Sequence, residues 1–260
     1  MTDAAPKKPR PSRSKAAKAA AAQAVARGPL WRRMLRWAGR GFLGLAAFYL
    51  VLILLFAFVN PPTNLYMWSE GRRLGGVDQV SVDFADMAPV MARSVVAAED
   101  SNFCLHWGFD MAAIRAAAAD GGNRGASTLT QQVVKNVFLW QGRSWLRKAM
   151  EAVMTPVVEL VWTKRRILEV YLNVAEFDGG VFGVQAAAHH YFGVDAADLS
   201  PTQAARLAAV LPDPKGRSAG KPSSFVRKRA GQIAGGAETI RVDGRAQCFE
   251  EQASLKLLHF

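Results

Sequence analysis

The strongest hydrophobic pattern in the chain is an unbroken apolar stretch near its start. Residues 41–59, GFLGLAAFYLVLILLFAFV, contain no charged side chain over 19 positions. A helix of that length covers roughly 30 Å of hydrocarbon, and a helix of a soluble core would have a polar face that this stretch lacks. A cleaved signal peptide is the alternative, but the run is long, and Asn60-Pro61-Pro62 follows it instead of a small-residue cleavage site. The pattern predicts one transmembrane helix over residues 41–59.

Beyond residue 88 the apolar positions recur mostly with helical spacing. Residues 112–119 are nearly all alanine, which is the best helix former. Residues 146–162 and 164–174 repeat apolar side chains three and four positions apart. These segments predict a mainly α domain.

The residues after position 199 predict the start of a further helix. Ser200 suits the N-cap, Pro201 the first helical position and Gln203 the third, as in a capping box. We expect this helix to run to Leu211, because Pro212 cannot continue it.

Between the apolar stretch and the helical part lies a connector, residues 60–84. It contains two prolines and the pair Gly75-Gly76, and then alternates polar and apolar residues over 77–84. Alternation of this kind predicts one strand or hairpin arm.

The net charge of +12 is concentrated at the start of the chain. Residues 1–40 hold eleven Lys and Arg and a single acid, which accounts for +10 and leaves about +2 for the remainder. A basic whole chain suggests nucleic acid, but the nearly neutral remainder argues against it, and we expect no nucleic-acid partner. A basic stretch directly before an apolar helix predicts a cytoplasmic N-terminus. Everything after residue 60 would then lie outside the inner membrane, in the periplasm of a Gram-negative cell.

Two cysteines, Cys104 and Cys248, fall in the portion expected to be exported. An oxidising compartment permits a disulfide between them. Two buried free thiols are the alternative, and the sequence leaves both open.

Polar side chains concentrate between residues 97 and 136. Glu99 and Asp100 stand at the end of an apolar run, and Phe103 and His106 follow closely. A Gly-rich turn then precedes a set of hydroxyls, amides and a lysine: Ser127, Thr128, Thr130, Gln131, Gln132, Lys135 and Asn136. Buried polar groups are costly unless they are paired, so the pattern indicates a polar-lined cleft.

Two segments of this cluster resemble the signatures of a known enzyme family. EDSNFCLHWGFD resembles the E-D-x-x-F-x-x-H-x-G-x-D signature of the bacterial peptidoglycan glycosyltransferases, which polymerise lipid II. GASTLTQQVVKN is similar to the G-x-S-T-x-T-Q-Q-x-x-K-N signature of the same family. Residues 147–159, 164–193 and 199–214 resemble its other motifs, with Gln203 where the family usually has Glu.

The resemblance covers about residues 85–215 and sets the expected domain organisation. It implies a lysozyme-like, mainly α glycosyltransferase domain and, as in the monofunctional members, no transpeptidase domain. The expected parts are a basic cytoplasmic tail (1–40), a transmembrane helix (41–59), a connector (60–84), the glycosyltransferase domain (85–215) and a C-terminal extension (216–260).

The resemblance also implies a reaction and its partners. Lipid II would be the acceptor and an undecaprenyl-linked glycan the donor, with undecaprenyl diphosphate as leaving group and inversion to a β-1,4 linkage. Membrane lipid and other cell-wall synthesis proteins are the further partners expected. No cofactor is expected to be required, although the family can use divalent cations such as Mg or Mn.

Glycosyl transfer to a hydroxyl needs a base, and the leaving group needs cationic partners. Glu99 is the candidate base, because neighbouring Ala97, Ala98 and Phe103 could raise its pKa by desolvation. Lys135 and Arg147 suit a departing diphosphate. Glu151 lies one helical turn after Arg147 and could orient it through charge-assisted hydrogen bonds. The other expected substrate-binding residues are Asp100, Phe103, His106, Ser127, Thr128, Gln131, Gln132, Asn136 and Lys148.

Other interpretations compete with this one. A lytic enzyme of related fold would cleave the same polymer, but it would not need Lys135 and Arg147 beside its acid. A membrane scaffold without enzymatic activity is the third hypothesis. His189 and His190 suggest a metal, yet neighbouring helix residues point in different directions, so we expect no metal site. Trp68, Trp140 and Trp145 are candidates for the membrane interface, with ordinary packing as the alternative.

Overall fold

A computed structural model describes residues 14–15, 17–18, 30–121 and 125–250 of the chain. The chain forms two compact units, residues 1–52 and 53–260. Much of the basic tail predicted for residues 1–40 lies outside the described residues.

The predicted transmembrane segment forms helix α2, Leu30–Phe56, which is long and apolar enough to cross a membrane. The helix begins eleven residues before the predicted start, because Arg32, Arg33 and neighbouring residues are good helix formers that extend the apolar run. It ends at Phe56, three residues before the predicted end at residue 59.

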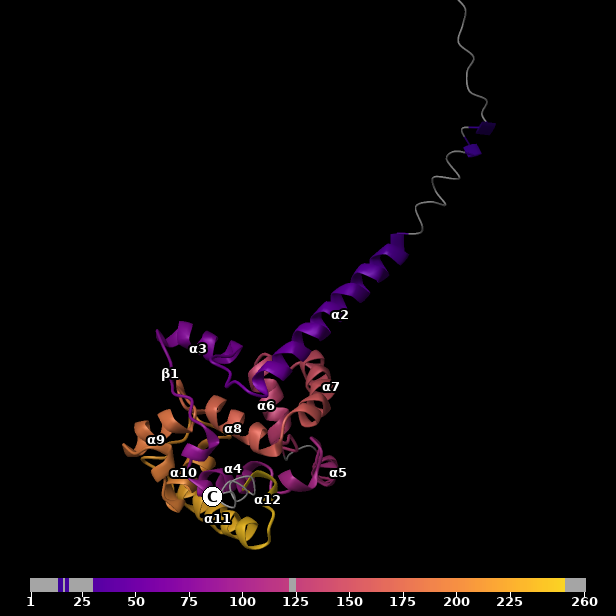
Figure 1. The fold of residues 1–260 in the computed structure, drawn as a ribbon. Coiled ribbons are helices and arrows are strands. Elements are labelled where there is room, and N and C mark those ends of the chain that lie inside the picture. Colours follow the sequence, from indigo (N-terminus) through magenta and orange to yellow (C-terminus); the bar gives the residue numbers. More distant parts are fainter. Residues whose placement is uncertain (1–13, 16, 19–29, 122–124, 251–260) are drawn as a thin grey trace, which may run out of the picture. The chain divides into compact units, whose positions relative to one another are not determined.

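The second unit is mostly helical, as predicted (Figure 1). Helices α4, α10 and α11 pack on one another, and α6 packs on both α7 and α8. The buried side chains of these helices form the core. The helices are α3 (Leu65–Leu74), α4 (Pro89–Glu99), α5 (Met111–Ala119), α6 (Leu129–Phe138), α7 (Trp145–Val161), α8 (Lys164–Val174), α9 (Val184–Phe192), α10 (Pro201–Val210), α11 (Ser224–Val242) and α12 (Gln247–Glu250), with 3₁₀ turns η1 (Phe84–Asp86), η2 (Phe103–Leu105) and η3 (Ala196–Asp198).

Side-chain caps fix where the helices around the site begin. Thr128 opens α6 and Ser200 opens α10, each with a complete capping box closed by a glutamine. Ser144 and Thr163 cap α7 and α8 in the same way, by accepting a hydrogen bond from a backbone N–H of the first turn. The helix start predicted at Ser200 is therefore confirmed.

The connector is more structured than the sequence analysis predicted. A strand, β1 (Asp78–Gln79), lies where alternation suggested one, but α3 precedes it and was not predicted. The signals for α3 are present in the sequence, because Asn64 caps its start and Gly75 adopts the left-handed conformation that ends it.

A small three-stranded sheet stands beside the helices, in the order β1-β3-β2. β3 (Val181–Phe182) pairs parallel with β1 and antiparallel with β2 (Glu176–Asp178). Gly183 follows β3 with φ +83°, and a Cβ there would lie 2.9 Å from the carbonyl oxygen of Asn173. Glycine is therefore required at the close approach between this sheet and the end of α8.

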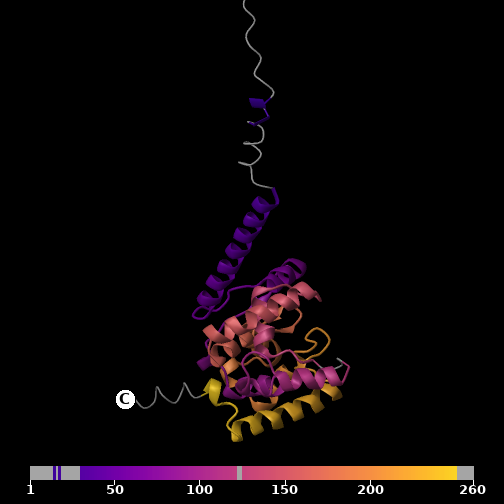
Figure 2. The same ribbon diagram turned by 90° about the vertical axis from the view of Figure 1, so that its right-hand side faces the viewer.

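The C-terminal segment belongs to the same packed unit. Helix α11 packs along α4 and α10 and runs along the outside of the unit in Figure 2. A disulfide joins Cys248 in α12 to Cys104 in η2. The part of the predicted extension 216–260 that the structure describes is thus bound to the first signature segment.

Residues 53–60 belong to the second unit and are hydrogen-bonded within it. The indole Nε1 of Trp162 donates to the carbonyl oxygen of Ile53 over 2.7 Å. Arg166 donates to the carbonyl oxygen of Phe56 at 2.9 Å and to Oδ1 of Asn60 at 2.7 Å. Residues 53–56 are therefore held at the junction of α7 and α8.

Candidate active site

Glu99 is the last residue of α4 and faces α6. Its Oε2 accepts a hydrogen bond from Nε2 of Gln132 over 3.0 Å, and Oε1 of Gln132 accepts one from the hydroxyl of buried Tyr171 at 3.2 Å. Burial raises the pKa of Glu99, while the bond from Gln132 and the charges of Arg229 and Lys135 oppose that rise. The result is a half-buried carboxyl with one oxygen already oriented, which suits a general base.

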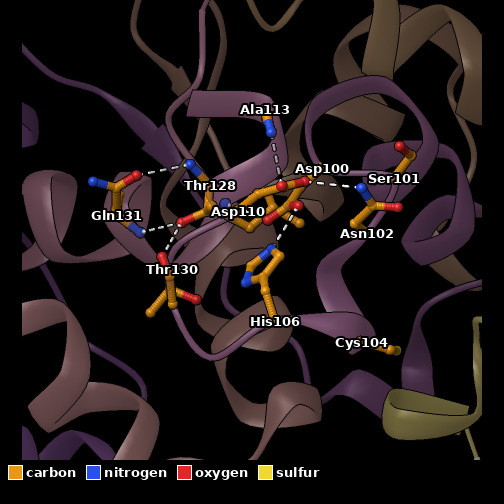
Figure 3. A network of polar contacts seen from close by, with 12 residues as sticks. Asp100, Ser101, Asn102, Cys104, His106, Asp110, Ala113, Thr128, Thr130 and Gln131 are labelled. Atoms are coloured by element: carbon orange, nitrogen blue, oxygen red, sulfur yellow. Dashed lines mark hydrogen bonds and ion pairs between the residues drawn. The ribbon is translucent and has the colours of Figure 1, made fainter. Parts of the chain in front are cut away.

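Asp100 connects three segments of the site rather than facing solvent. It is 7% exposed. Its Oδ1 lies 2.9 Å from Nε2 of His106, and its Oδ2 accepts a hydrogen bond from the backbone N–H of Leu129 at 3.0 Å. Figure 3 shows the imidazole of His106 pointing at this carboxylate. Asp100 and His106, expected to bind substrate, are placed in contacts within the protein, and Phe103 is fully buried.

The second signature forms the start of α6. Thr128 and Gln131 exchange the two bonds of the capping box, which is visible in Figure 3. The hydroxyl of Thr128 also donates to the carbonyl oxygen of Gly108 at 2.7 Å. Both side chains are buried, so their polar groups serve to fix α6 against the first signature.

Lys135 follows Gln132 on the same face of α6. Its amine has no ion-pair partner among the residues that the structure describes. Burial lowers the pKa of Lys135, whereas the charge of Glu151 opposes that change. A cation held without a partner is available to an anionic ligand.

A cavity of about 320 Å³ opens beside Gln132 and Lys135. One part of its wall carries amides and the lysine, and the other part is apolar. Among the expected site residues, Asn136 also reaches this cavity, and its Oδ1 accepts a hydrogen bond from Gln141 at 3.3 Å. The cavity is lined by Tyr66, Gln132, Lys135, Asn136, Gln141, Tyr171, Val174, Ala175, Glu176, Leu211, Pro212 and Pro214.

A second group of charges lies at the start of α7. Oε2 of Glu151 accepts from Arg147 at 2.7 Å, and its Oε1 accepts from the amine of Lys148. Arg147 also donates from Nε to the carbonyl oxygen of Gly142 at 2.9 Å, and Lys148 donates to the exposed hydroxyl of Ser127 at 3.4 Å. Glu151 is 2% exposed, so a buried carboxylate orients both cations through charge-assisted hydrogen bonds.

Arg143 is a residue that the sequence analysis missed. It lines a second cavity, of about 340 Å³, together with Ser144, Trp145, Arg147 and Lys148. The signal was weak because Arg143 precedes the cap of α7, where a charged residue is typical of an exposed loop. We call Arg143, Arg147, Lys148 and Glu151 the basic cluster.

The donor set of the basic cluster does not suit a resident divalent cation. Mg²⁺ prefers carboxylate and carbonyl oxygens, and both oxygens of Glu151 are already bonded to Arg147 and Lys148. Among the described residues, no group of three or more His, Cys, Asp or Glu side chains could hold a metal ion. His189 and His190 bond separately to Asp195 and Asp178.

Known proteins similar in sequence identify the family of this chain. A protein-family model described as Transglycosylase matches residues 70–237. A curated relative from Jannaschia sp. (strain CCS1), a biosynthetic peptidoglycan transglycosylase, is 62% identical over 220 residues, which is 85% of this chain and 92% of the relative. Relatives of the same name from Xanthomonas axonopodis pv. citri (strain 306) and Pseudomonas putida (strain GB-1) are 49% and 50% identical over 213 and 211 residues. These alignments cover 78% and 77% of this chain and 87% and 89% of the relatives.

Proposed function

The chain belongs to the transglycosylase family and is a peptidoglycan glycosyltransferase, and we propose that it polymerises lipid II into β-1,4-linked glycan with release of undecaprenyl diphosphate. The observation that carries the proposal is the hydrogen bond from Gln132 to Glu99, because Gln132 lines a cavity on α6 together with Lys135. This arrangement supplies a base and a cation on adjacent helices, which are the two groups that the reaction needs.

In the proposed step Glu99 removes the proton of the 4-hydroxyl of the acceptor's N-acetylglucosamine. The hydroxyl oxygen attacks the anomeric carbon of the lipid-linked glycan from the face opposite the diphosphate. The new C–O bond forms as the bond from that carbon to the diphosphate oxygen breaks, and its electron pair leaves with undecaprenyl diphosphate. Attack from the opposite face inverts the linkage from α to β.

Gln132 prepares the base for this step. The amide nitrogen of Gln132 fixes Oε2 of Glu99. The other carboxylate oxygen, Oε1 of Glu99, accepts no hydrogen bond from the described residues, so Oε1 of Glu99 can receive the proton. Tyr171 holds the other end of the amide at 3.2 Å and so sets which way the nitrogen points. A fixed carboxylate loses less entropy in the transition state than a mobile one.

Lys135 and the basic cluster stabilise the departing diphosphate. Glu151 pairs with Arg147 and Lys148, and Arg143 lines the same cavity as these two cations, so positive charge remains in excess there. Arginine matches phosphate oxygens with two parallel donors, and lysine acts as a point charge. These protein cations supply counter-charge for the diphosphate.

Helix α7 supports the proposal that the domain works at a membrane surface. Its outward side is apolar, with Leu146, Val153 and Leu160 65%, 70% and 75% exposed, while the acids Glu151 and Glu159 point inward and are buried. Large exposed apolar patches mark surfaces that contact lipid or protein. Trp162, the residue after α7, donates a hydrogen bond to the carbonyl oxygen of Ile53, so the C-terminal end of α7 lies beside residue 53. The undecaprenyl tails could therefore stay in the bilayer during the reaction.

We further propose a single-pass protein of the inner membrane, with the N-terminus cytoplasmic and the catalytic domain periplasmic. The basic residues before the apolar helix support this orientation. In this orientation Glu99 would meet substrate sugars on the periplasmic side.

The test is a polymerisation assay on the full chain in detergent with purified lipid II. Wild type is expected to make a lysozyme-digestible polymer, and Glu99→Gln none. Glu238→Gln is the matched control, because Glu238 is an exposed carboxylate on α11 whose partner among the described residues is Arg241. A wild-type protein that leaves lipid II unchanged but releases fragments from finished peptidoglycan would be a lytic enzyme, and the proposal would be wrong.

A further inference from the structure

A buried ion pair between Glu159 and Lys164 contacts both signature segments. The sequence analysis did not identify it. Glu159 is near the end of α7 and Lys164 is the first residue of α8. Oε1 of Glu159 accepts from Nζ of Lys164 over 2.8 Å. The side chains are 2% and 14% exposed, so the pair is almost completely removed from water.

Each member of the pair also holds one of the two signature segments. Nζ of Lys164 donates to the carbonyl oxygen of His106 at 2.8 Å and lies 4.5 Å from the centre of the Phe103 ring. Oε1 of Glu159 accepts from the hydroxyl of Thr130 at 2.6 Å, in the first turn of α6. Lys164 therefore binds the first signature segment, and Glu159 binds the second.

These contacts complete a closed ring of buried polar groups. From His106 the ring continues through its imidazole to Asp100 at 2.9 Å, and from Asp100 to the N–H of Leu129 at 3.0 Å. Leu129 is the neighbour of Thr130 in α6, so the ring returns to Glu159. Two residues of the candidate site are close in sequence to members of this ring: Glu99 precedes Asp100, and Gln132 follows Thr130 by two positions.

Gly108 shows how closely α7 approaches the first signature within this ring. Its φ is +84°, and a Cβ there would lie 2.7 Å from Cγ2 of Thr155 and 3.1 Å from Cγ of Glu159. The backbone of the signature thus lies directly on the pair, and a shift of Glu159 would be transmitted to it.

A buried ion pair is a poor way to gain stability alone. Desolvating two charges is costly, and an apolar replacement of similar volume is often neutral or stabilising. Here the pair joins the α7–α8 junction to both signature segments. An apolar contact has no directional preference and could not fix the orientation of these segments. Hydrogen bonds to charged groups are directional and strong in a buried setting.

We propose that Glu159 and Lys164 are positioning residues that set Glu99 against Gln132 and Lys135. The inference rests on the proposed function only for its kinetic consequence, since the holding of the two signatures is a structural property. Neither residue touches substrate; each acts through the backbone of His106 or the hydroxyl of Thr130.

The test compares single and double variants of the full chain in detergent. Lys164→Met leaves Glu159 buried and unpaired, so both the melting temperature and kcat should fall. Glu159→Gln with Lys164→Met removes both charges and keeps the volumes, so the melting temperature should return towards wild type. In that double variant kcat on lipid II should stay at least about tenfold low, with KM changed less than about threefold, since small misplacements of reacting groups cost about 100-fold in rate.

Hydrogen exchange gives a second reading that does not need activity. The double variant should exchange faster than wild type by about tenfold at residues 101–108 and 127–132, and not in α10 or α11, because local opening reports the contacts that were removed. Glu169→Gln is the matched control, since Glu169 is a partly buried carboxylate on α8 that pairs with Arg166, away from both signatures.

The outcomes separate the two proposals. A double variant that regains wild-type melting, kcat and exchange would show that the pair serves only stability and would overturn the inference. A wild-type protein that does not use lipid II would overturn the proposed function, and hydrogen exchange alone would then decide the role of the pair. If the double variant does not fold, Thr130→Val removes the hydroxyl donor to Glu159 and leaves the ion pair with Lys164 in place. In that variant kcat should fall about threefold, and hydrogen exchange at residues 127–132 should be faster. Exchange at the wild-type rate there would contradict the inference.

Discussion

Gln132 donates a hydrogen bond to Glu99 across 3.0 Å, and this contact joins the end of α4 to the middle of α6. The two residues belong to different signatures, 33 positions apart in the chain. The contact stabilises the ionised form of Glu99, whereas burial favours the neutral form. The balance between these effects controls the pH at which the base is ready.

Replacing Gln132 by leucine should move the acidic limb of kcat/KM to higher pH. The base must be ionised to act, and loss of the amide N–H raises the pKa of Glu99 further above that of an ordinary glutamate. The measurement is the rate of lipid II polymerisation against pH. Tyr171→Phe is the comparison: it removes the hydroxyl that orients the amide but keeps the donor of Gln132, so the limb should move less than in Gln132→Leu. A limb that moves equally in both variants would contradict the assignment.

Glu99→Gln should abolish polymerisation and yet raise the melting temperature at pH 7. The pKa of Glu99 is raised in the folded state, mainly by burial, so the folded protein holds this proton to higher pH than the unfolded chain. Its ionisation therefore costs stability as the pH rises from the unfolded pKa through the folded one. The gain should disappear near pH 4, where the wild-type carboxyl is largely protonated in both states, and thermal melting at the two pH values measures it. Equal gains at both would contradict the explanation.

Glu151→Gln should lower kcat by about 10- to 100-fold, because Arg147 and Lys148 lose the carboxylate that orients them. The measurement is the initial rate of polymerisation at saturating lipid II. Glu70→Gln is a close control: Glu70 is also buried and also bonds two cations, Arg73 and Lys215, which hold its pKa at about 2.

Glu70→Gln should cost stability without the loss of rate. The contribution of Glu70 to folding is present above its unfolded pKa and is lost as the pH falls towards about 2. A loss of rate as large as that of Glu151→Gln would mean that any buried carboxylate variant slows the enzyme, and the specific role of Glu151 would be wrong.

Removal of the disulfide with Cys104→Ser and Cys248→Ser should lower the free energy of unfolding by about 2–4 kcal/mol, since the cross-link restricts the unfolded chain. Urea denaturation with and without reductant measures it. Reductant should destabilise wild type by a similar amount and leave the double variant unchanged. If reductant has no effect on wild type, the bond does not form in solution.

A photoreactive phenylalanine analogue in place of Val153 should cross-link to lipid in vesicles containing the full chain. Val153 lies on the apolar outward side of α7, which we propose contacts the bilayer. The same analogue in place of Lys228, an exposed residue of α11, serves as the control. Equal lipid labelling at the two positions would contradict a membrane-facing α7.

Local sequence predicted the helices that carry their own signals. The capping box at Ser200 and the apolar spacing of residues 164–174 both appear in the structure as expected. Helix α3 was missed although Asn64 and Gly75 mark its ends, because the prolines before it and the alternation after it suggested a connector.

Contacts between distant segments could not be derived in the same way. Motifs identified Glu99 and Lys135 as candidates, but only the fold brings Asp100 to the N–H of Leu129 and Lys164 to the carbonyl of His106. Arg143 was missed for a related reason: it is a loop residue, and only the fold shows that it lines a cavity. Spacing along a chain gives no distance between its segments.

The bond between Cys104 and Cys248 also constrains the order in which the protein can be made. Cys248 follows Cys104 by 144 residues, so a ribosome completes the signature segments long before the cysteine that closes the loop emerges. A chain that stops before residue 248 would keep Glu99, Gln132, Lys135 and Glu151 but could not form the cross-link. Closure of the first signature therefore reports that synthesis of the whole domain has finished.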